Sequence, residues 1–392
     1  MKYDFETLLV RYGVGSDKWD SMRGEIPDLP DDIVPLSVAD MEFKNAPEIM
    51  EGLKEYLDSS ILGYTGATDA YYEAVMGFMA RHHGFTPKKE WFVEYSGIVP
   101  ALRQMVAAFT KPGDGVLIMT PVYYPFRMVA DANGCQIVET ELVETDGKYT
   151  IDFDDFEAKA ARENVKLFIL CSPHNPVGHV WTETELCRMA EICLKHDVFI
   201  LSDEIHFDLI MPGYRHVSML ALEEKYQQNC AVCTSPGKTF NLAGLQASNI
   251  FIPDEERRRA ALAARIGFSL NALSYKATEI AYTRCDGWMA EMLEYIAGNK
   301  RFVTEYVRER LPMLRVSEME GTYLLWMDCR ALGLDTKGLE ALMKKAYLFL
   351  DEGYIFGKGG EGFERWNLAC PRRVLAAALE RLEKTLRQEN LI

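Results

Sequence analysis

The stretch VKLFILCSPHNPVGHVWTETELCRMAEICLKHDVFILSD (residues 165–203) places an amphipathic segment between two short apolar runs. The runs at 165–171 and 198–203 do not alternate polar with apolar residues, which is typical of parallel strands covered on both faces. The segment between them carries apolar residues at helical spacing, and Thr182 and Glu185 are placed as a capping box at its start. This strand, helix, strand order predicts an α/β fold with a mainly parallel sheet.

The same pattern extends outward from this stretch. Two further apolar runs predict strands and one proline-led segment predicts a helix: GVLIM (115–119), CAVCTS (230–235) and PEIMEGLKEYLDS (47–59). The last hundred residues differ, because long amphipathic helices there surround short strands. We therefore expect a large α/β domain at 46–285 and a smaller α+β domain formed by 1–45 and 286–392.

Composition excludes several classes of protein. The chain has 392 residues, of which 48% are hydrophobic and 26% charged, as in a two-domain globular protein. Its formal charge of -16 would repel nucleic acid and an anionic membrane surface, so we expect neither as a partner. The start lacks the order of a signal peptide, and no apolar run is long enough to cross a bilayer. Nine cysteines, mostly within apolar runs, are typical of reduced thiols and predict a cytoplasmic location.

Two pairs of potential metal ligands have ordinary interpretations. Cys230 and Cys233 form a C-x-x-C inside a predicted strand, without a second cysteine or histidine pair at zinc spacing. We interpret them as buried structural thiols and expect no metal site. The adjacent His82 and His83 lie in the polar stretch ARHHGF, which favours a solvated surface.

Polar side chains follow each of the predicted strands. Since ligands of open α/β sheets bind beyond the carboxyl ends of the strands, these side chains should surround one crevice. The set comprises Tyr123, Asn175, Asp203, His206, Ser235 and Lys238. Taken singly, each has a common structural explanation, such as a turn, a helix cap or a surface lysine.

Together the residues match the requirements of pyridoxal phosphate. A carboxylate, for which Asp203 is placed, keeps the pyridine nitrogen protonated, and an aromatic ring such as Tyr123 stacks on the pyridine. The phosphate requires backbone amides at a helix start, which the Ser-Gly turn at 96–98 supplies, with a hydroxyl added by Ser235. Lys238 then binds the aldehyde and moves the α-proton.

The motifs themselves resemble a known family. HNPVG (174–178), SDEIH (202–206) and SPGKTFNLAGLQ (235–246) resemble the fold-type I pyridoxal-phosphate enzymes of the class I/II aminotransferase superfamily. A second set is similar to the cystathionine β-lyase branch of C-S lyases: SVADMEF (37–43), GYT (63–65), SGIVPAL (96–102), PVYYPF (121–126) and RWNLACPR (365–372). The resemblance implies a mainly parallel, seven-stranded sheet flanked by helices in the large domain, and pyridoxal 5'-phosphate as cofactor.

The resemblance also implies a role for each matched residue. Lys238 matches the Schiff-base lysine and Arg365 the arginine that grips the substrate carboxylate. Tyr64 matches a catalytic tyrosine that reaches the cofactor of the neighbouring subunit, which implies a homodimer with shared sites. The remaining cofactor-binding positions are Gly97, Ile98, Tyr123, Asn175, Asp203, His206 and Ser235, with Asn175 also facing the substrate.

The implied reaction is β-elimination from L-cystathionine or a related cysteine S-conjugate, which yields a thiol, pyruvate and ammonia. An aminotransferase built from the same residues is the alternative, and His206 favours the lyase by resemblance. A regulatory or binding protein that keeps the fold without the chemistry is a third possibility. Gln246 stands where many aminotransferases have an arginine, so the phosphate charge would be less fully neutralised here.

Overall fold

The larger sheet of the protein has seven strands in the order β1-β9-β8-β7-β6-β2-β3. The computed structural model describes residues 2–265 and 270–392. Strand β9 pairs antiparallel with both neighbours, and the other pairs are parallel. The strands are β1 (Phe92–Ser96), β2 (Gly115–Thr120), β3 (Gln136–Glu141), β6 (Val165–Cys171), β7 (Phe199–Asp203), β8 (Cys230–Thr234) and β9 (Ala247–Phe251). The predicted mainly parallel sheet is confirmed.

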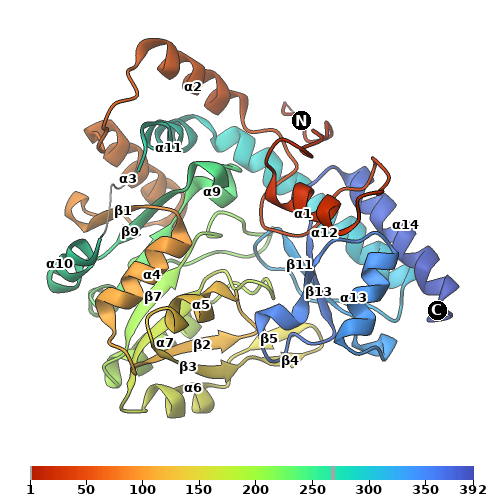
Figure 1. The fold of residues 1–392 in the computed structure, drawn as a ribbon. Coiled ribbons are helices and arrows are strands. Elements are labelled where there is room, and N and C mark those ends of the chain that lie inside the picture. The colour runs from red at the N-terminus through yellow and green to blue at the C-terminus, as the bar shows by residue number, and fades with distance from the viewer. Residues whose placement is uncertain (1, 266–269) are drawn as a thin grey trace.

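Helices cover both faces of this sheet (Figure 1). Alternate side chains of β2 enter two different apolar clusters, Val116 and Ile118 in one and Leu117 and Met119 in the other. The first cluster includes α4 (Ile98–Phe109), α5 (Pro125–Asp131) and α10 (Glu255–Ala264). The second includes α6 (Phe153–Ala160), α7 (Glu183–Lys195) and α8 (Glu224–Gln227). Burial on both faces explains why the strands lack alternation.

The predicted helix starts are observed. The Thr182 side chain accepts from the backbone of Glu185, and the Glu185 side chain accepts from the Thr182 backbone, which completes the capping box of α7. Helix α2 (Pro47–Ser59) begins at Pro47, as predicted, and packs with α3 (Asp69–His83) against α11 (Ala272–Arg284). A single turn, α9 (Pro236–Thr239), carries Lys238.

A second, antiparallel sheet has the order β10-β11-β13-β12. Its strands are β10 (Arg315–Val316), β11 (Leu324–Asp328), β12 (Asp351–Glu352) and β13 (Phe363–Asn367). The helices of this part are α12 (Asp286–Arg310), α13 (Thr336–Lys345) and α14 (Arg372–Gln388), and a short hairpin, β4 (Val143–Thr145) and β5 (Lys148–Thr150), precedes α6.

The N-terminal segment, with α1 (Asp17–Glu25), lies beside these C-terminal elements (Figure 1). The backbone N–H of Leu36 donates to Phe349 O, and that of Asn367 donates to Leu36 O, both at 2.9 Å. The division into domains at 45/46 and 285/286 stays a prediction.

The structure corrects the prediction for one histidine. His83 is buried, with 8% of its surface exposed, and its ring stacks on Phe207 with centroids 4.1 Å apart. The prediction of a solvated surface holds for His82, which is exposed, and was wrong for His83, because the last turn of α3 points this side chain inward although its sequence neighbours are polar. Cys230 and Cys233 are both fully buried in β8, which confirms that interpretation. Within the described ranges, no helix has the length and apolar character needed to span a bilayer.

Candidate active site

Six of the predicted residues line one small cavity of about 90 Å³ at the carboxyl ends of the strands. They are Tyr123, Asn175, Asp203, His206, Lys238 and Arg365. Val38, Ala39, Tyr124, Cys171, Ile205 and Asp351 complete the wall. Strands β2, β6, β7 and β8 place the first five at the edge of the large sheet, and β13 of the second sheet supplies Arg365.

The turn that carries Lys238 is held at its start by a serine. Ser235 Oγ accepts from the backbone N–H of Gly237 at 2.9 Å and donates to Ala247 O at 2.6 Å. Lys238 Nζ donates to the carbonyl of Ala39 at 2.7 Å. The hydrogen bonds of Ser235 therefore hold the start of the turn against β9, and the Lys238 side chain lines the cavity.

Burial is the main cause that lowers the pKa of Lys238 to about 8, and repulsion from Arg365 adds to it. The negative charges of Asp40 and Asp203 partly oppose this fall in the pKa. Part of the amine population is therefore neutral near physiological pH. A neutral amine can attack an aldehyde and can accept a proton from carbon.

Asp203 ends β7 and is 3% exposed. The backbone N–H of Ile205 donates to its Oδ1 at 3.3 Å. Burial raises the pKa of Asp203 to about 7, and the Ile205 hydrogen bond and the charge of Lys238 oppose this rise. A nearby cation would stabilise the ionised form of this buried carboxyl group.

His206 lies one turn further along. Burial, with the positive charges of Lys238 and Arg365, holds its pKa well below the usual value, so the ring is neutral. Its Nδ1 is buried and has no hydrogen-bond partner among the described residues. His206 thus contributes a neutral ring to the wall of the cavity.

Arg365 is 4% exposed and is held from two sides. Its Nη1 donates to Asn175 Oδ1 at 2.9 Å, and its Nη2 forms an ion pair with Asp351. Because the Asn175 oxygen is engaged with Arg365, the amide's NH₂ group is left to donate elsewhere in the cavity.

Asp351 connects Arg365 to the segment around Val38. The backbone N–H of Val38 donates to Asp351 Oδ2 at 2.9 Å. Val38 has φ of 51°, a conformation that a β-branched residue adopts at a cost and that surrounding contacts must hold. Tyr323 Oη donates to Ala39 O at 2.8 Å, so this carbonyl accepts from both Tyr323 and Lys238.

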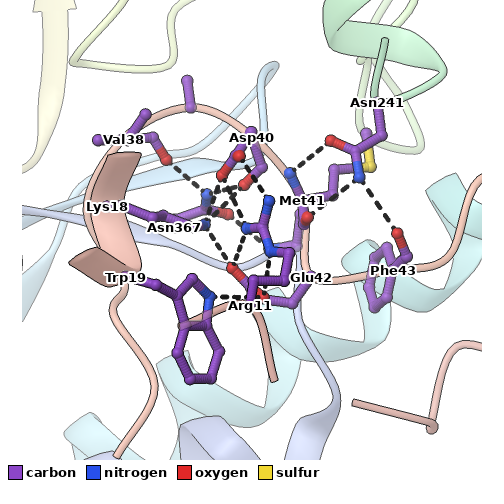
Figure 2. Close-up of polar contacts among 12 residues, drawn as sticks. Arg11, Lys18, Trp19, Val38, Asp40, Met41, Glu42, Phe43, Asn241 and Asn367 are labelled. Carbon is purple, nitrogen blue, oxygen red and sulfur yellow. Dashed lines mark hydrogen bonds and ion pairs between the residues drawn. The ribbon is translucent and has the colours of Figure 1, made fainter. Parts of the chain in front are cut away.

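Figure 2 shows how residues 38–43 are fixed. Asn367 Nδ2 donates to the carbonyls of Val38 (2.8 Å) and Asp40 (2.7 Å). The ammonium of Lys18 lies 2.7 Å from carboxylate oxygens of both Asp40 and Glu42, and Arg11 pairs with the same two carboxylates. Asn241, three residues after Lys238, bonds the backbone of Met41 and Phe43 from the other side.

The predicted phosphate-binding residues lie outside the cavity wall. Gly97 precedes α4 with φ of 87°, and its N–H donates to Gln246 O at 2.6 Å. Ser235 bonds Ala247, so both groups meet at the start of β9. The next amides of the α4 start, beginning with that of Ile98, have no acceptor within the helix, as in any first turn.

Tyr64 also lies outside this cavity. It is 94% exposed and lines a separate surface pocket of about 530 Å³ with Leu62, Ser96 and Leu270.

Sequence reasoning missed Asp351, Tyr323 and the backbone of Val38 and Ala39. Asp351 directly follows the apolar run at 347–350, where an acidic residue gives no sign of a partner. Tyr323 lies at 322–328, one of the short strands predicted in the last hundred residues. SVADMEF carries the family resemblance, yet the orientation of a backbone carbonyl leaves no signal in a sequence. Contacts between distant segments create this part of the site.

Comparisons with known proteins agree with this geometry. The family described as aminotransferase class I and II matches residues 31–382. The chain is 39% identical to cystathionine beta-lyase PatB of Bacillus subtilis (strain 168) over 387 residues, covering 98% of this chain and 100% of that one.

Two solved structures are similar along their whole length. Cystalysin from Treponema denticola, which contains a pyridoxal 5'-phosphate cofactor, is 46% identical with a TM-score of 0.97 and covers 99% of this chain and 100% of its own. A PLP-bound C-S lyase from Staphylococcus hominis is 32% identical with a TM-score of 0.92, covering 98% of each chain. Because the family model matches residues 31–382, and the sheet order and the cavity at the strand ends agree with it, this chain belongs to the aminotransferase class I and II family.

Proposed function

We propose that this protein is a pyridoxal-phosphate-dependent carbon–sulfur lyase that eliminates a thiol from L-cystathionine or a related cysteine S-conjugate. The observation that carries the proposal is the convergence of a lysine amine, a buried carboxyl and a buried guanidinium on one cavity. Similarity along the whole chain to proteins named cystathionine beta-lyase and C-S lyase supports the same reaction.

The residues of the cavity fit the cofactor. Asp203 is buried with its pKa raised, so pairing with a protonated pyridine nitrogen would relieve its unfavourable position. The Lys238 amine would bind the aldehyde, Tyr123 would stack on the ring and the Asn175 NH₂ group would donate to the phenolic oxygen. The α4 start would hold the phosphate, and Ser235 would contribute by turning its hydroxyl hydrogen from Ala247 O to a phosphate oxygen. When bound, the cofactor supplies an electron sink for the pair left behind by deprotonation of the substrate α-carbon.

The substrate is held at its carboxylate by Arg365. A planar guanidinium suits a two-pronged grip on a carboxylate, and Asn175 and Asp351 keep it from rotating. This grip fixes the α-carbon relative to Lys238. The neutral imidazole of His206 adds no competing positive charge.

Lys238 then acts as the base. Its amine accepts the α-proton, which the pKa of about 8 allows near neutral pH, and the Ala39 carbonyl receives a hydrogen bond from the ammonium that results. The Cβ–S bond breaks with its electron pair going to sulfur, and a Cα=Cβ double bond forms. The released 2-aminoacrylate takes up water and gives pyruvate and ammonia.

Pyruvate release tests this function. Purified protein loaded with pyridoxal phosphate is given L-cystathionine without any 2-oxo acid, and sustained production of pyruvate and thiol over many turnovers is expected. A single partial turnover that resumes when a 2-oxo acid is added would instead identify an aminotransferase.

We propose further that the protein is a homodimer with shared sites. Tyr64 lies outside the cavity of its own chain, and it is exposed together with Ile61 (92%) and Leu62 (62%), as expected of residues that a second copy covers. Mixing the inactive variants Lys238→Ala and Tyr64→Ala should restore activity, because one site of each mixed dimer is intact. A mixture that stays inactive, although mixed dimers form, would contradict shared sites.

We also place the protein in the cytoplasm and divide it into a large domain at 46–285 and a small domain at 1–45 and 286–392. All nine cysteines are free thiols, which suits a reducing compartment. The hydrogen bonds of Leu36 to Phe349 and Asn367 support assigning the N-terminal segment to the small domain.

A further inference from the structure

A buried polar chain lies directly behind the turn that carries Lys238. Thr239 Oγ1 donates to Asp208 Oδ2 at 2.5 Å, and Asp208 Oδ1 lies 2.7 Å from His83 Nε2. The exposed fractions of Thr239, Asp208 and His83 are 0%, 7% and 8%. None of the three lines the cavity, so they have no contact with a ligand there.

Helix geometry connects this chain to the lysine. Lys238 and Thr239 are consecutive in α9, and successive helical side chains point about 100° apart. Lys238 extends toward Ala39 while Thr239 enters the core. A hydrogen bond that holds Thr239 therefore limits rotation of the turn that aims the lysine amine.

Asp208 belongs to the turn after β7. Two backbone hydrogen bonds fold this turn, from Phe207 N to Glu204 O (3.0 Å) and from Leu209 N to His206 O (2.9 Å). The same turn begins at Asp203, the predicted partner of the pyridine nitrogen. The Thr239–Asp208 bond thus joins the element that carries the amine to the element that carries the carboxyl.

His83 supports Asp208 from the far side. Its ring stacks on Phe207, the neighbour of Asp208, with an interplanar angle of 23°. Stacking and the contact with Asp208 Oδ1 together restrict the carboxylate to one orientation.

We propose that Thr239 and Asp208, oriented by His83, are positioning residues that fix the Lys238 amine relative to Asp203. The proposal rests on the function assigned to Lys238 above. The chain offers a matched control for a purely stabilising hydrogen bond: Thr140 Oγ1 donates to Asp155 Oδ2 at 2.7 Å, and Thr140 is 1% exposed. This pair joins β3 to α6, and neither residue lines the cavity.

The test measures capture of the cofactor aldehyde, not turnover. Full-length protein freed of cofactor is mixed with pyridoxal phosphate, the adduct is trapped with borohydride at timed intervals, and the labelled peptide is identified by mass. Thr239→Val, which keeps the shape and removes the hydroxyl, should slow capture at Lys238 about tenfold. Thr239→Ser should restore the rate, and Asp208→Asn should slow it as Thr239→Val does.

The control separates positioning from stability. Thr140→Val should lower the melting temperature by an amount similar to Thr239→Val and leave the capture rate unchanged. Capture by Thr239→Val at the wild-type rate, or equal slowing by Thr140→Val, would overturn the proposal. If Thr239→Val does not fold, the comparison of Thr239→Ser with Asp208→Asn decides in the same way. Failure of the wild-type protein to label Lys238 would instead refute the proposed function.

Discussion

The two sides of the cavity are built differently. On the sheet side, Asp203 ends a buried strand, and Asn175 and Lys238 each follow one within a few residues. On the opposite side, Val38 and Ala39 meet Asp351 and Arg365, and the bond from Val38 to Asp351 joins residues 313 positions apart. Local elements therefore place the groups assigned to the cofactor, whereas long-range pairing places those assigned to the substrate. Mutations on the two sides should differ in the step they impair.

The largest effect is expected on the sheet side, from Lys238→Ala. Loss of the amine removes both the attachment group and the base, so pyruvate formation should fall at least about a thousandfold while the fold is retained. Circular dichroism checks the fold. Lys225→Ala is the control, since its ammonium pairs with Glu191 on the surface (3.2 Å), and it should retain full activity. Undiminished activity of Lys238→Ala would refute the assignment.

The next effect concerns the pH dependence of stability in the cofactor-free protein. The pKa of Asp203 is raised from 3.8 to about 7, so between these values the folded state binds more protons than the unfolded state, and stability falls as pH rises. The shift corresponds to about 4 kcal/mol between pH 4 and 7. Asp203→Asn should remove this contribution, as measured by urea unfolding at several pH values. The same slope in the variant would show that other groups cause it.

On the opposite side, Asp351→Asn should act mainly on substrate binding. The change removes the charge paired with Arg365 but keeps an oxygen for the Val38 amide. We expect kcat/KM to fall about tenfold through a higher KM. Asp328→Asn is the matched control, because Asp328 pairs with Arg330 (2.7 Å) outside the cavity. A lower kcat with an unchanged KM would place Asp351 in the chemical step instead.

The smallest effect is expected for Tyr323→Phe. It removes the hydrogen bond to Ala39 O and should cost about 1 kcal/mol of unfolding free energy. Since Lys238 still donates to the same carbonyl, kcat should change less than about threefold. Tyr71→Phe, which loses a buried bond to Asn249 (2.8 Å), is the control for stability. A tenfold loss of kcat confined to Tyr323→Phe would assign this hydroxyl a part in catalysis.

The same contrast explains which predictions succeeded. The strands at 165–171 and 198–203 and the start of α7 could be predicted because apolar runs and capping residues act over a few positions. His83 was misjudged because its burial depends on Phe207 and Asp208, which are far away in sequence. Asp351 was missed because an acidic residue shows no partner until the strands β12 and β13 are paired.

The parallel α/β core and the order of chemical groups at its strand ends can be predicted from local sequence patterns, since strand burial and helix capping are local effects. The wall of the cavity opposite the large sheet depends instead on contacts between distant segments. Ala39 turns its carbonyl toward Lys238 because Asn367, Lys18 and Asp351 hold the strained segment around Val38. Val38 lies 329 positions from Asn367 and 313 positions from Asp351, whereas Lys18 is only 22 positions from Asp40. This geometry therefore exists only after the N-terminal segment has packed against the second sheet.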